Sequence, residues 1–181
     1  MRVIAGSRGG AALVAPRGRA TRPTGDRVRE ALFSILGPLA GERVLDLYAG
    51  SGALAIEALS RGAAEATLVD CSPAAIAAIR TNLAAVGIAA EVRRQRAASF
   101  LEHARTHARQ YDLVFLDPPY RQVSEAGRDL SRALAPVLAP AARVVAESDR
   151  RAPLILDLPL LDERRYGDTL IRIHSYDDDR T

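Results

Sequence analysis

The sequence predicts an α/β fold with a doubly wound, mostly parallel seven-stranded sheet of the Rossmann-like kind. Short apolar runs alternate with longer segments of helical periodicity from residue 43 to residue 146, the pattern of repeated βα units. The segment 158–176 instead indicates two strands around Gly167-Asp168, an antiparallel end to the sheet. A chain of 181 residues has the length of about one domain with one core.

Each element follows from its local pattern. Two β-like runs, 2–6 and 11–15, flank a glycine-rich turn and predict a small N-terminal hairpin. Asp26 is expected to cap an amphipathic helix that ends at Gly37-Pro38. The strands that follow are expected at 43–47, 66–69, 91–94, 112–116 and 142–146, and the helices at 52–61, 73–86, 97–108 and 125–138.

The basic residues are unusual in kind and in position. All 25 are arginine, which excludes mechanisms that need a Schiff-base or P-loop lysine. The first thirty residues hold seven arginines and two acids, a net charge of +5 in a chain whose total is +3. This asymmetry favours a polyanionic partner, nucleic acid first, over a merely solvated basic face. We therefore expect residues 1–25 to form a basic arm that recognises RNA and residues 26–181 to form the catalytic domain.

The sequence also restricts compartment and metal binding. It has no apolar stretch of signal-peptide or membrane-span length, and its single cysteine, Cys71, excludes an internal disulfide. A cytoplasmic protein without membrane attachment is expected. His103 and His107 stand four residues apart on a predicted helix, but no third ligand accompanies them. No metal site is expected.

In open α/β sheets, ligands bind beyond the carboxyl ends of the strands. The first predicted strand carries Asp46 near its end and leads into Gly50 and Gly52, which permit a tight turn and close approach of a ligand to a helix N-terminus. With Ala55 these glycines also fit the dinucleotide fingerprint. Asp70 closes the second strand and indicates a ribose in either interpretation.

The charge of Asp46 separates the two cofactor classes. A pyrophosphate about 4 Å from this carboxylate would cost on the order of 1 kcal/mol in water and roughly 4 kcal/mol at intermediate dielectric. S-adenosylmethionine instead presents an ammonium and a sulfonium, which an acid attracts. A nicotinamide-dependent oxidoreductase remains an alternative at this point. Helix capping also remains an alternative role for Asp46, and for Asp70 at the helix that Pro73 opens.

The most specific signal follows the fourth predicted strand, where the sequence reads Asp117-Pro118-Pro119-Tyr120. Two prolines fix the turn, while the Asp117 side chain and the Pro118 carbonyl remain as acceptors. An exocyclic amino group of a nucleobase offers two donors to such a pair, and Tyr120 offers a face for base stacking, worth about 1–3 kcal/mol. The turn therefore indicates methyl transfer to an amino nitrogen, with these four residues as the catalytic candidates.

These motifs carry a family resemblance. Asp46-Leu-Tyr-Ala-Gly-Ser-Gly-Ala and the turn at 117–120 resemble the motifs of class I methyltransferases that act on amino nitrogens. Arg22-Pro-Thr-Gly-Asp-Arg-Val-Arg-Glu-Ala-Leu-Phe33, Arg2-Val-Ile-Ala-Gly6 and Glu57-Ala-Leu-Ser-Arg-Gly62 resemble the RsmD family of 16S ribosomal RNA guanine-N2 methyltransferases. The resemblance spans nearly the whole chain, and its N-terminal part is the family-specific one.

The resemblance implies an enzyme that transfers a methyl group from S-adenosylmethionine to guanine N2 in the assembled small ribosomal subunit. We also expect the protein to be a monomer. It implies that Asp46, Gly50 and Gly52 surround the methionine moiety and that Asp70 binds ribose. Many relatives place an acid after the third strand to accept from adenine; Arg96 stands here and cannot accept, so we expect Gln95 or a backbone carbonyl instead. Alternatives are a DNA or RNA adenine-N6 methyltransferase and a non-catalytic nucleic-acid-binding module.

Two sets of candidate residues complete the prediction. The candidates for cofactor binding are Asp46, Tyr48, Gly50, Gly52, Asp70, Cys71 and Ala97. The candidates for RNA binding are Arg8, Arg17, Arg19, Arg22, Arg27, Arg29 and Arg121.

Overall fold

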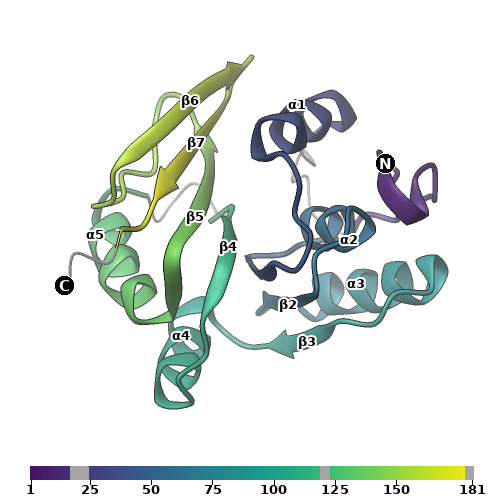
Figure 1. Ribbon diagram of the computed structural model, residues 1–181, viewed down its shortest axis with the longest axis horizontal. Helices are drawn as coiled ribbons and strands as arrows, with labels where there is room; N and C mark the ends of the chain where they lie inside the picture. Colours follow the sequence, from purple (N-terminus) through teal and green to yellow (C-terminus); the bar gives the residue numbers. More distant parts are fainter. Residues whose placement is uncertain (17–24, 119–122, 178–181) are drawn as a thin grey trace. The chain divides into compact units, whose positions relative to one another are not determined.

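The computed structural model describes residues 1–16, 25–118 and 123–177 of the chain (Figure 1). The seven strands of the fold form one mixed sheet in the order β3-β2-β1-β4-β5-β7-β6, which confirms the predicted fold class. The chain divides into two compact units, residues 1–95 and residues 96–181, which are described in turn. The predicted functional division between residues 25 and 26 is a different boundary and stays a prediction.

The first unit carries three parallel strands in the order β3-β2-β1. In the register, Leu47 of β1 lies opposite Val69 of β2, and Val69 lies opposite Arg93 of β3. The apolar residues of β1 and β2 are almost fully buried, as expected for inner strands of a parallel sheet. The elements of this unit are η1 (Gly6–Arg8), α1 (Asp26–Leu36), β1 (Arg43–Leu47), α2 (Ala53–Ser60), β2 (Glu65–Asp70), α3 (Pro73–Val86) and β3 (Glu91–Arg94).

The N-terminal hairpin is docked on α2, and one isolated bridge joins its two arms in place of the β-like runs expected at 2–6 and 11–15. Arg2 and Ala12 form an antiparallel bridge, and the turn between them contains η1. The buried carboxylate of Glu57 in α2 accepts from the amides of Ile4 (2.6 Å) and Ala5 (3.0 Å). Figure 1 shows this purple segment beside α2. Because these amides complete the hydrogen bonding of a buried carboxylate, the hairpin is part of the structure of the first unit.

A second buried polar residue links the same segment to the loop after β1. Asn82 of α3 is 1% exposed, and its side chain accepts from the amide of Val14 (2.8 Å) and donates to the Val14 carbonyl (2.9 Å). The same amide group donates to the carbonyl of Ser51 (2.9 Å). One side chain therefore fixes both the end of the N-terminal hairpin and the glycine-containing loop before α2.

The second unit carries four strands in the order β4-β5-β7-β6. β4 and β5 are parallel, with Leu116 opposite Ala146, and β5 continues past this point to Asp149. β7 is antiparallel to both β5 and β6, which confirms the predicted antiparallel end. The elements are α4 (Ala97–Thr106), β4 (Tyr111–Leu116), α5 (Val123–Leu134), η3 (Ala135–Val137), β5 (Leu138–Asp149), β6 (Leu160–Tyr166) and β7 (Thr169–Ser175).

Three local predictions differ from the structure. The helix expected at 125–138 is α5, which spans Val123–Leu134 and is followed by the 3₁₀ helix η3. The N-cap of α1 is Gly25, and Asp26 is the first helical residue, where its carboxylate pairs with Arg29 one turn later. β5 begins at Leu138, four residues before the expected start; Ala141 has a positive φ of 61°, and the pairing register with β4 shifts near this end of the strands.

Within the described ranges, no helix combines the length and apolar character that crossing a membrane requires.

The close approach of the hairpin to α2 gives a stability prediction. A Cβ at Gly6 would lie 1.9 Å from the Ser60 carbonyl oxygen, whereas a Cβ at Gly10 would meet no atom within 4 Å. Both glycines have positive φ, +83° and +87°, so alanine is strained at both. Gly6→Ala should lower the free energy of unfolding by at least about 2 kcal/mol more than Gly10→Ala, measured by urea denaturation. Equal losses would mean that the hairpin is not docked on α2.

Candidate functional site

The loop between β1 and α2, residues 48–52, is tied to the carboxyl end of β2. The Asp70 carboxylate accepts from the Gly50 amide (3.0 Å) through one oxygen and from the Ser72 amide (2.8 Å) through the other. The Ala49 amide donates to the Val69 carbonyl (3.1 Å). Asp70 therefore holds the glycine loop against the next strand, in addition to the role predicted for it.

Three residues of this loop have left-handed backbone conformations: Tyr48 (φ 64°), Gly50 (φ 56°) and Gly52 (φ 76°). This region costs a non-glycine residue about 1–2 kcal/mol, so Tyr48 is strained. A Cβ at Gly52 would lie 2.7 Å from Leu68 Cδ2, whereas at Gly50 the nearest atom would be 3.9 Å away. Gly52 thus closes the packing against β2, while Gly50 leaves space beside bare backbone, which fits the close approach of a ligand.

Asp46 lies at the base of this loop and is 3% exposed. Its Oδ2 accepts from the Ala55 amide in the first turn of α2 (3.2 Å), although the N-cap residue of this helix is Gly52, so Asp46 satisfies a first-turn amide without being the N-cap. Burial raises the pKa of Asp46 to about 7; the Ala55 amide opposes this shift and the nearby Asp70 adds to it. Among the residues that the structure describes, no cationic side chain forms an ion pair with Asp46. A cationic ligand would supply the missing positive charge.

The capping alternative for Asp70 is not what the structure shows. The N-cap of α3 is Ser72, whose hydroxyl accepts from the Ala75 amide (3.4 Å) and precedes Pro73. Each carboxylate oxygen of Asp70 accepts one amide, and a carboxylate oxygen can accept a second donor. Asp70 therefore retains the capacity to accept from ribose hydroxyls.

Three further cofactor candidates surround these residues in the first unit. Tyr48 is half-buried, and burial raises the pKa of its hydroxyl, with a smaller contribution from Cys71. Cys71 is an exposed free cysteine. Gln95 donates its backbone amide to the Asp70 carbonyl (3.2 Å), and its side-chain Oε1 is buried without a donor in the described part of the chain. The expectation that Gln95 accepts from adenine stays a prediction, since this buried oxygen must become accessible before it can meet a ligand.

In the second unit, the structure places the remaining candidates on strand and helix ends. Asp117 follows β4 directly and is exposed, and Pro118 after it is buried. Ala97 is the first residue of α4 and is 8% exposed. Pro119, Tyr120 and Arg121 lie outside the described residues.

The RNA-binding candidates divide into two groups. Arg8 and Arg27 are exposed, and Arg8 donates weakly to the Gly87 carbonyl (3.5 Å). Arg29 is 1% exposed, donates to the Arg2 carbonyl and pairs with Asp26 (2.8 Å); burial lowers its pKa. The prediction that Arg29 contacts RNA is therefore wrong, because its guanidinium stabilises α1 against the hairpin. Outside the described ranges lie Arg17, Arg19 and Arg22.

His103 and His107 lie on and just after α4 with ring centroids 4.1 Å apart. His107 Nδ1 lies 2.8 Å from the His103 carbonyl oxygen and 3.1 Å from the Thr106 hydroxyl, so local backbone and side-chain contacts hold its ring. In residues 1–16, 25–118 and 123–177, no three His, Cys, Asp or Glu side chains are grouped for metal binding.

Comparisons with known proteins agree on one family. The family model described as Conserved hypothetical protein 95 matches residues 1–175. YlbH of Bacillus subtilis, by its name a candidate rRNA methyltransferase, is 38% identical over 180 residues, 96% of this chain and 98% of that protein. Ribosomal RNA small subunit methyltransferase D of Haemophilus influenzae is 34% identical over 181 residues, 96% and 93% of the two chains. A solved structure from Escherichia coli, titled as a candidate methyltransferase, superposes with a TM-score of 0.81 at 33% identity and 98% coverage of both chains.

The buried carboxylate gives a pH-dependent stability prediction. The folded pKa of Asp46, about 7, lies above its value of 3.8 in the unfolded chain, so the folded state binds more protons and stability falls as pH rises from about 4 through 7. Asp46→Asn keeps an acceptor for the Ala55 amide and removes the buried charge. In the absence of ligand it should stabilise the protein at pH 8 by up to about 4 kcal/mol, and by much less at pH 5.

Thermal unfolding of Asp46→Asn and of the parent protein across this pH range checks the prediction. Glu30→Gln, which removes an exposed carboxylate from α1, is the matched control and should shift the melting temperature little at any pH. A destabilised Asp46→Asn variant at pH 8 would show that the carboxylate is charged and compensated within the fold.

Proposed function

Because this chain belongs to the Conserved hypothetical protein 95 family, the RsmD family, we propose that it methylates the exocyclic N2 of a guanine in 16S ribosomal RNA. The coarser activity, methylation of ribosomal RNA, is the one that the name of the Haemophilus influenzae relative gives, and S-adenosylmethionine is the methyl donor of this reaction in the proposal. The observation that carries the proposal is, in the first unit, the pair Asp46 and Asp70 at the ends of β1 and β2 with the open glycine loop between them in sequence; the second unit adds Asp117, directly after β4.

The first unit supplies the groups that suit the cofactor. Asp46 is buried without a cationic partner in the described residues, and it complements the ammonium and sulfonium of S-adenosylmethionine. Asp70 accepts from the ribose hydroxyls while it holds Gly50, and Gln95 Oε1 accepts from the adenine amino group. The bare backbone at Gly50 lets the methionine moiety approach the loop. A pyrophosphate at the same place would raise the pKa of Asp46 further and leave it neutral, so only the cationic cofactor gains attraction from this residue, which favours S-adenosylmethionine over a nicotinamide dinucleotide.

The turn after β4 supplies the groups that suit the methyl acceptor. The Asp117 side chain and the Pro118 carbonyl accept the two N–H donors of the exocyclic amine and orient its lone pair. The cofactor supplies an electrophilic methyl group. When bound, S-adenosylmethionine would give this methyl group to the nitrogen and leave as the neutral thioether. The Asp117 carboxylate can receive the proton that the nitrogen then loses.

The proposal includes a preassembled substrate, the assembled small subunit, as the family resemblance implies. Within residues 1–181 the βα body takes up most of the sequence, and the hairpin and α1 are smaller than an RRM or KH domain. A surface that the assembled subunit presents would then contribute to recognition of the guanine. Naked ribosomal RNA is expected to be a much poorer substrate than the subunit.

The direct test uses small ribosomal subunits from a strain that lacks this protein. The parent protein should transfer methyl groups to them, and nucleoside mass spectrometry should identify N2-methylguanosine. Asp117→Asn should lower the rate of methyl transfer by about 10²–10⁴-fold. It should change the Kd for S-adenosylmethionine by no more than about twofold, because the residues proposed to bind this cofactor lie in the first unit. Calorimetry measures the binding and a filter assay measures the rate.

Asp129→Asn is the matched control, since it removes an exposed carboxylate from α5 of the same unit. It should keep the parent rate. N6-methyladenosine as the product would support the adenine alternative, and unchanged activity of Asp117→Asn would remove the turn from the mechanism.

A further inference from the structure

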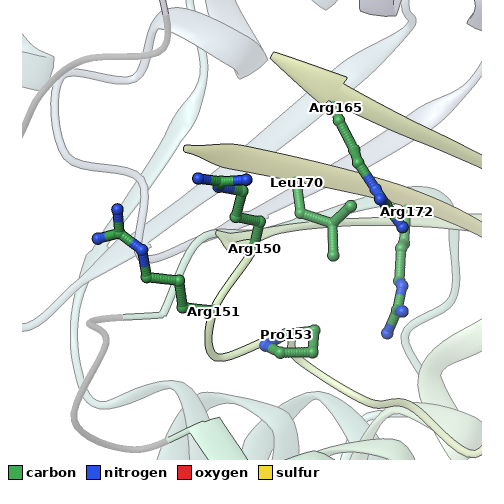
Figure 2. Close-up of a pocket in the computed structure, with 6 residues that line it drawn as sticks. All are labelled: Arg150, Arg151, Pro153, Arg165, Leu170 and Arg172. Carbon is green, nitrogen blue, oxygen red and sulfur yellow. The ribbon is translucent and has the colours of Figure 1, made fainter. Parts of the chain in front are cut away.

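An arginine-lined pocket lies in the second unit, apart from the residues proposed for catalysis. It has a volume of about 440 Å³ and is open to solvent. Figure 2 shows Arg150 and Arg151 on one side of Leu170 and Pro153, and Arg165 and Arg172 on the other. None of these residues belongs to the basic N-terminal arm.

The β6–β7 hairpin forms one wall because of strand alternation. Arg165 lies opposite Leu170 in the register, and Glu163 lies opposite Arg172, so these side chains share one face of the hairpin. The segment after β5 packs against the same face, where Arg172 donates to the Leu154 carbonyl (3.5 Å). The arginines are therefore brought together by tertiary structure from three places in the chain, residues 150–151, 165 and 172.

The pocket keeps an excess of positive charge. Asp168 Oδ1 accepts from both Arg150 (3.2 Å) and Arg151 (3.4 Å). Glu163 likewise pairs with both Arg165 (3.0 Å) and Arg172 (2.9 Å). Four guanidinium groups thus share two carboxylates. A third carboxylate, that of the nearby Asp149, accepts from the backbone amide of Arg151. Since each of these carboxylates is shared, guanidinium N–H groups remain for an anion.

The position of the pocket identifies the anion. β4 and β5 are parallel, so their carboxyl ends lie at the same edge of the sheet, and Asp117 follows β4 at that edge. Leu116 is level with Ala146, and β5 continues to Asp149, directly before Arg150. A strand rise of about 3.3 Å per residue places Arg150 roughly 10 Å beyond the level of Asp117. This separation suits the phosphates of nucleotides that flank a base held by the Asp117 turn.

We propose that the pocket formed by Arg150, Arg151, Arg165 and Arg172 binds backbone phosphates of the RNA next to the target base. The proposal rests on the proposed function. It adds a second RNA contact, in the unit that carries the Asp117 turn, to the basic arm of the first unit. Phosphate contacts of this kind position the substrate and do not select its sequence.

Three variants test the pocket. Arg150→Gln/Arg151→Gln removes two phosphate contacts. The matched control is Arg105→Gln/Arg132→Gln, which removes two exposed arginines that also pair with acids. These arginines lie near the ends of α4 and α5. Because the two helices lead into the starts of β4 and β5, they end at the edge of the sheet opposite to Asp117. Asp168→Asn removes the carboxylate that neutralises Arg150 and Arg151, and a phosphate site should gain affinity from it.

The measurement is fluorescence anisotropy with a labelled single-stranded RNA across a series of salt concentrations. Arg150→Gln/Arg151→Gln should weaken binding about fivefold per arginine near 0.1 M salt and reduce the slope of log K against log salt by about 0.7 per arginine. The control should match the parent protein, and Asp168→Asn should bind more tightly. Losses of equal size in the control, or weaker binding by Asp168→Asn, would overturn the proposal.

Two further measurements separate this proposal from its premise. Methylation of small subunits by the parent protein tests the proposed function by itself. If this activity is present, the KM for subunits tests the pocket. A KM of Arg150→Gln/Arg151→Gln equal to that of the parent protein would show that the pocket does not bind the substrate. Inorganic phosphate, compared with chloride at equal ionic strength, should compete with RNA for the parent protein more than for Arg150→Gln/Arg151→Gln. Phosphate binding that these substitutions abolish without any change in RNA affinity would identify a free-anion site instead.

Discussion

The first unit depends on one electrostatic constraint, a carboxylate buried at the end of β1 without a cationic partner among the described residues. Asp46 accepts a single amide hydrogen bond from α2, and burial keeps its pKa near 7. A buried acid that is only partly ionised destabilises the fold at neutral pH. The loop beside it also contains a strained Tyr48. Such costs, concentrated in one loop, are typical of a binding site that a ligand completes.

The rest of the first unit holds this loop in place. Asp70 fixes Gly50 from the end of β2, and Asn82 fixes Ser51 from α3. Asn82 also binds Val14, so the N-terminal hairpin and the proposed cofactor loop share one support. Glu57 binds the start of the hairpin in the same way. Removal of the whole N-terminal arm would therefore disturb the cofactor loop as well, and point substitutions of its exposed arginines separate RNA binding from structure.

Sequence periodicity was sufficient to predict the βα units, because apolar runs of strand length and helical spacing are local signals. It was insufficient where tertiary contacts decide a residue's role. Arg29 resembles its exposed neighbours in sequence, yet it is buried between α1 and the hairpin. Asn82 is a polar residue on a helix, and nothing local indicates its two partners. The arginines of the β6–β7 pocket escaped prediction because the strand register, and not sequence proximity, assembles them.

The central claim is that the charge on Asp46 and the positive charge of the methyl donor stabilise each other. Calorimetric titration with S-adenosylmethionine at pH 6.5, in two buffers of different ionisation enthalpy, measures the protons exchanged on binding. A cation beside Asp46 lowers its pKa from about 7, so the parent protein should release a substantial fraction of one proton, and Asp46→Asn should release none. Binding by the parent protein without proton release, or with release equal to that of Asp46→Asn, would contradict this account.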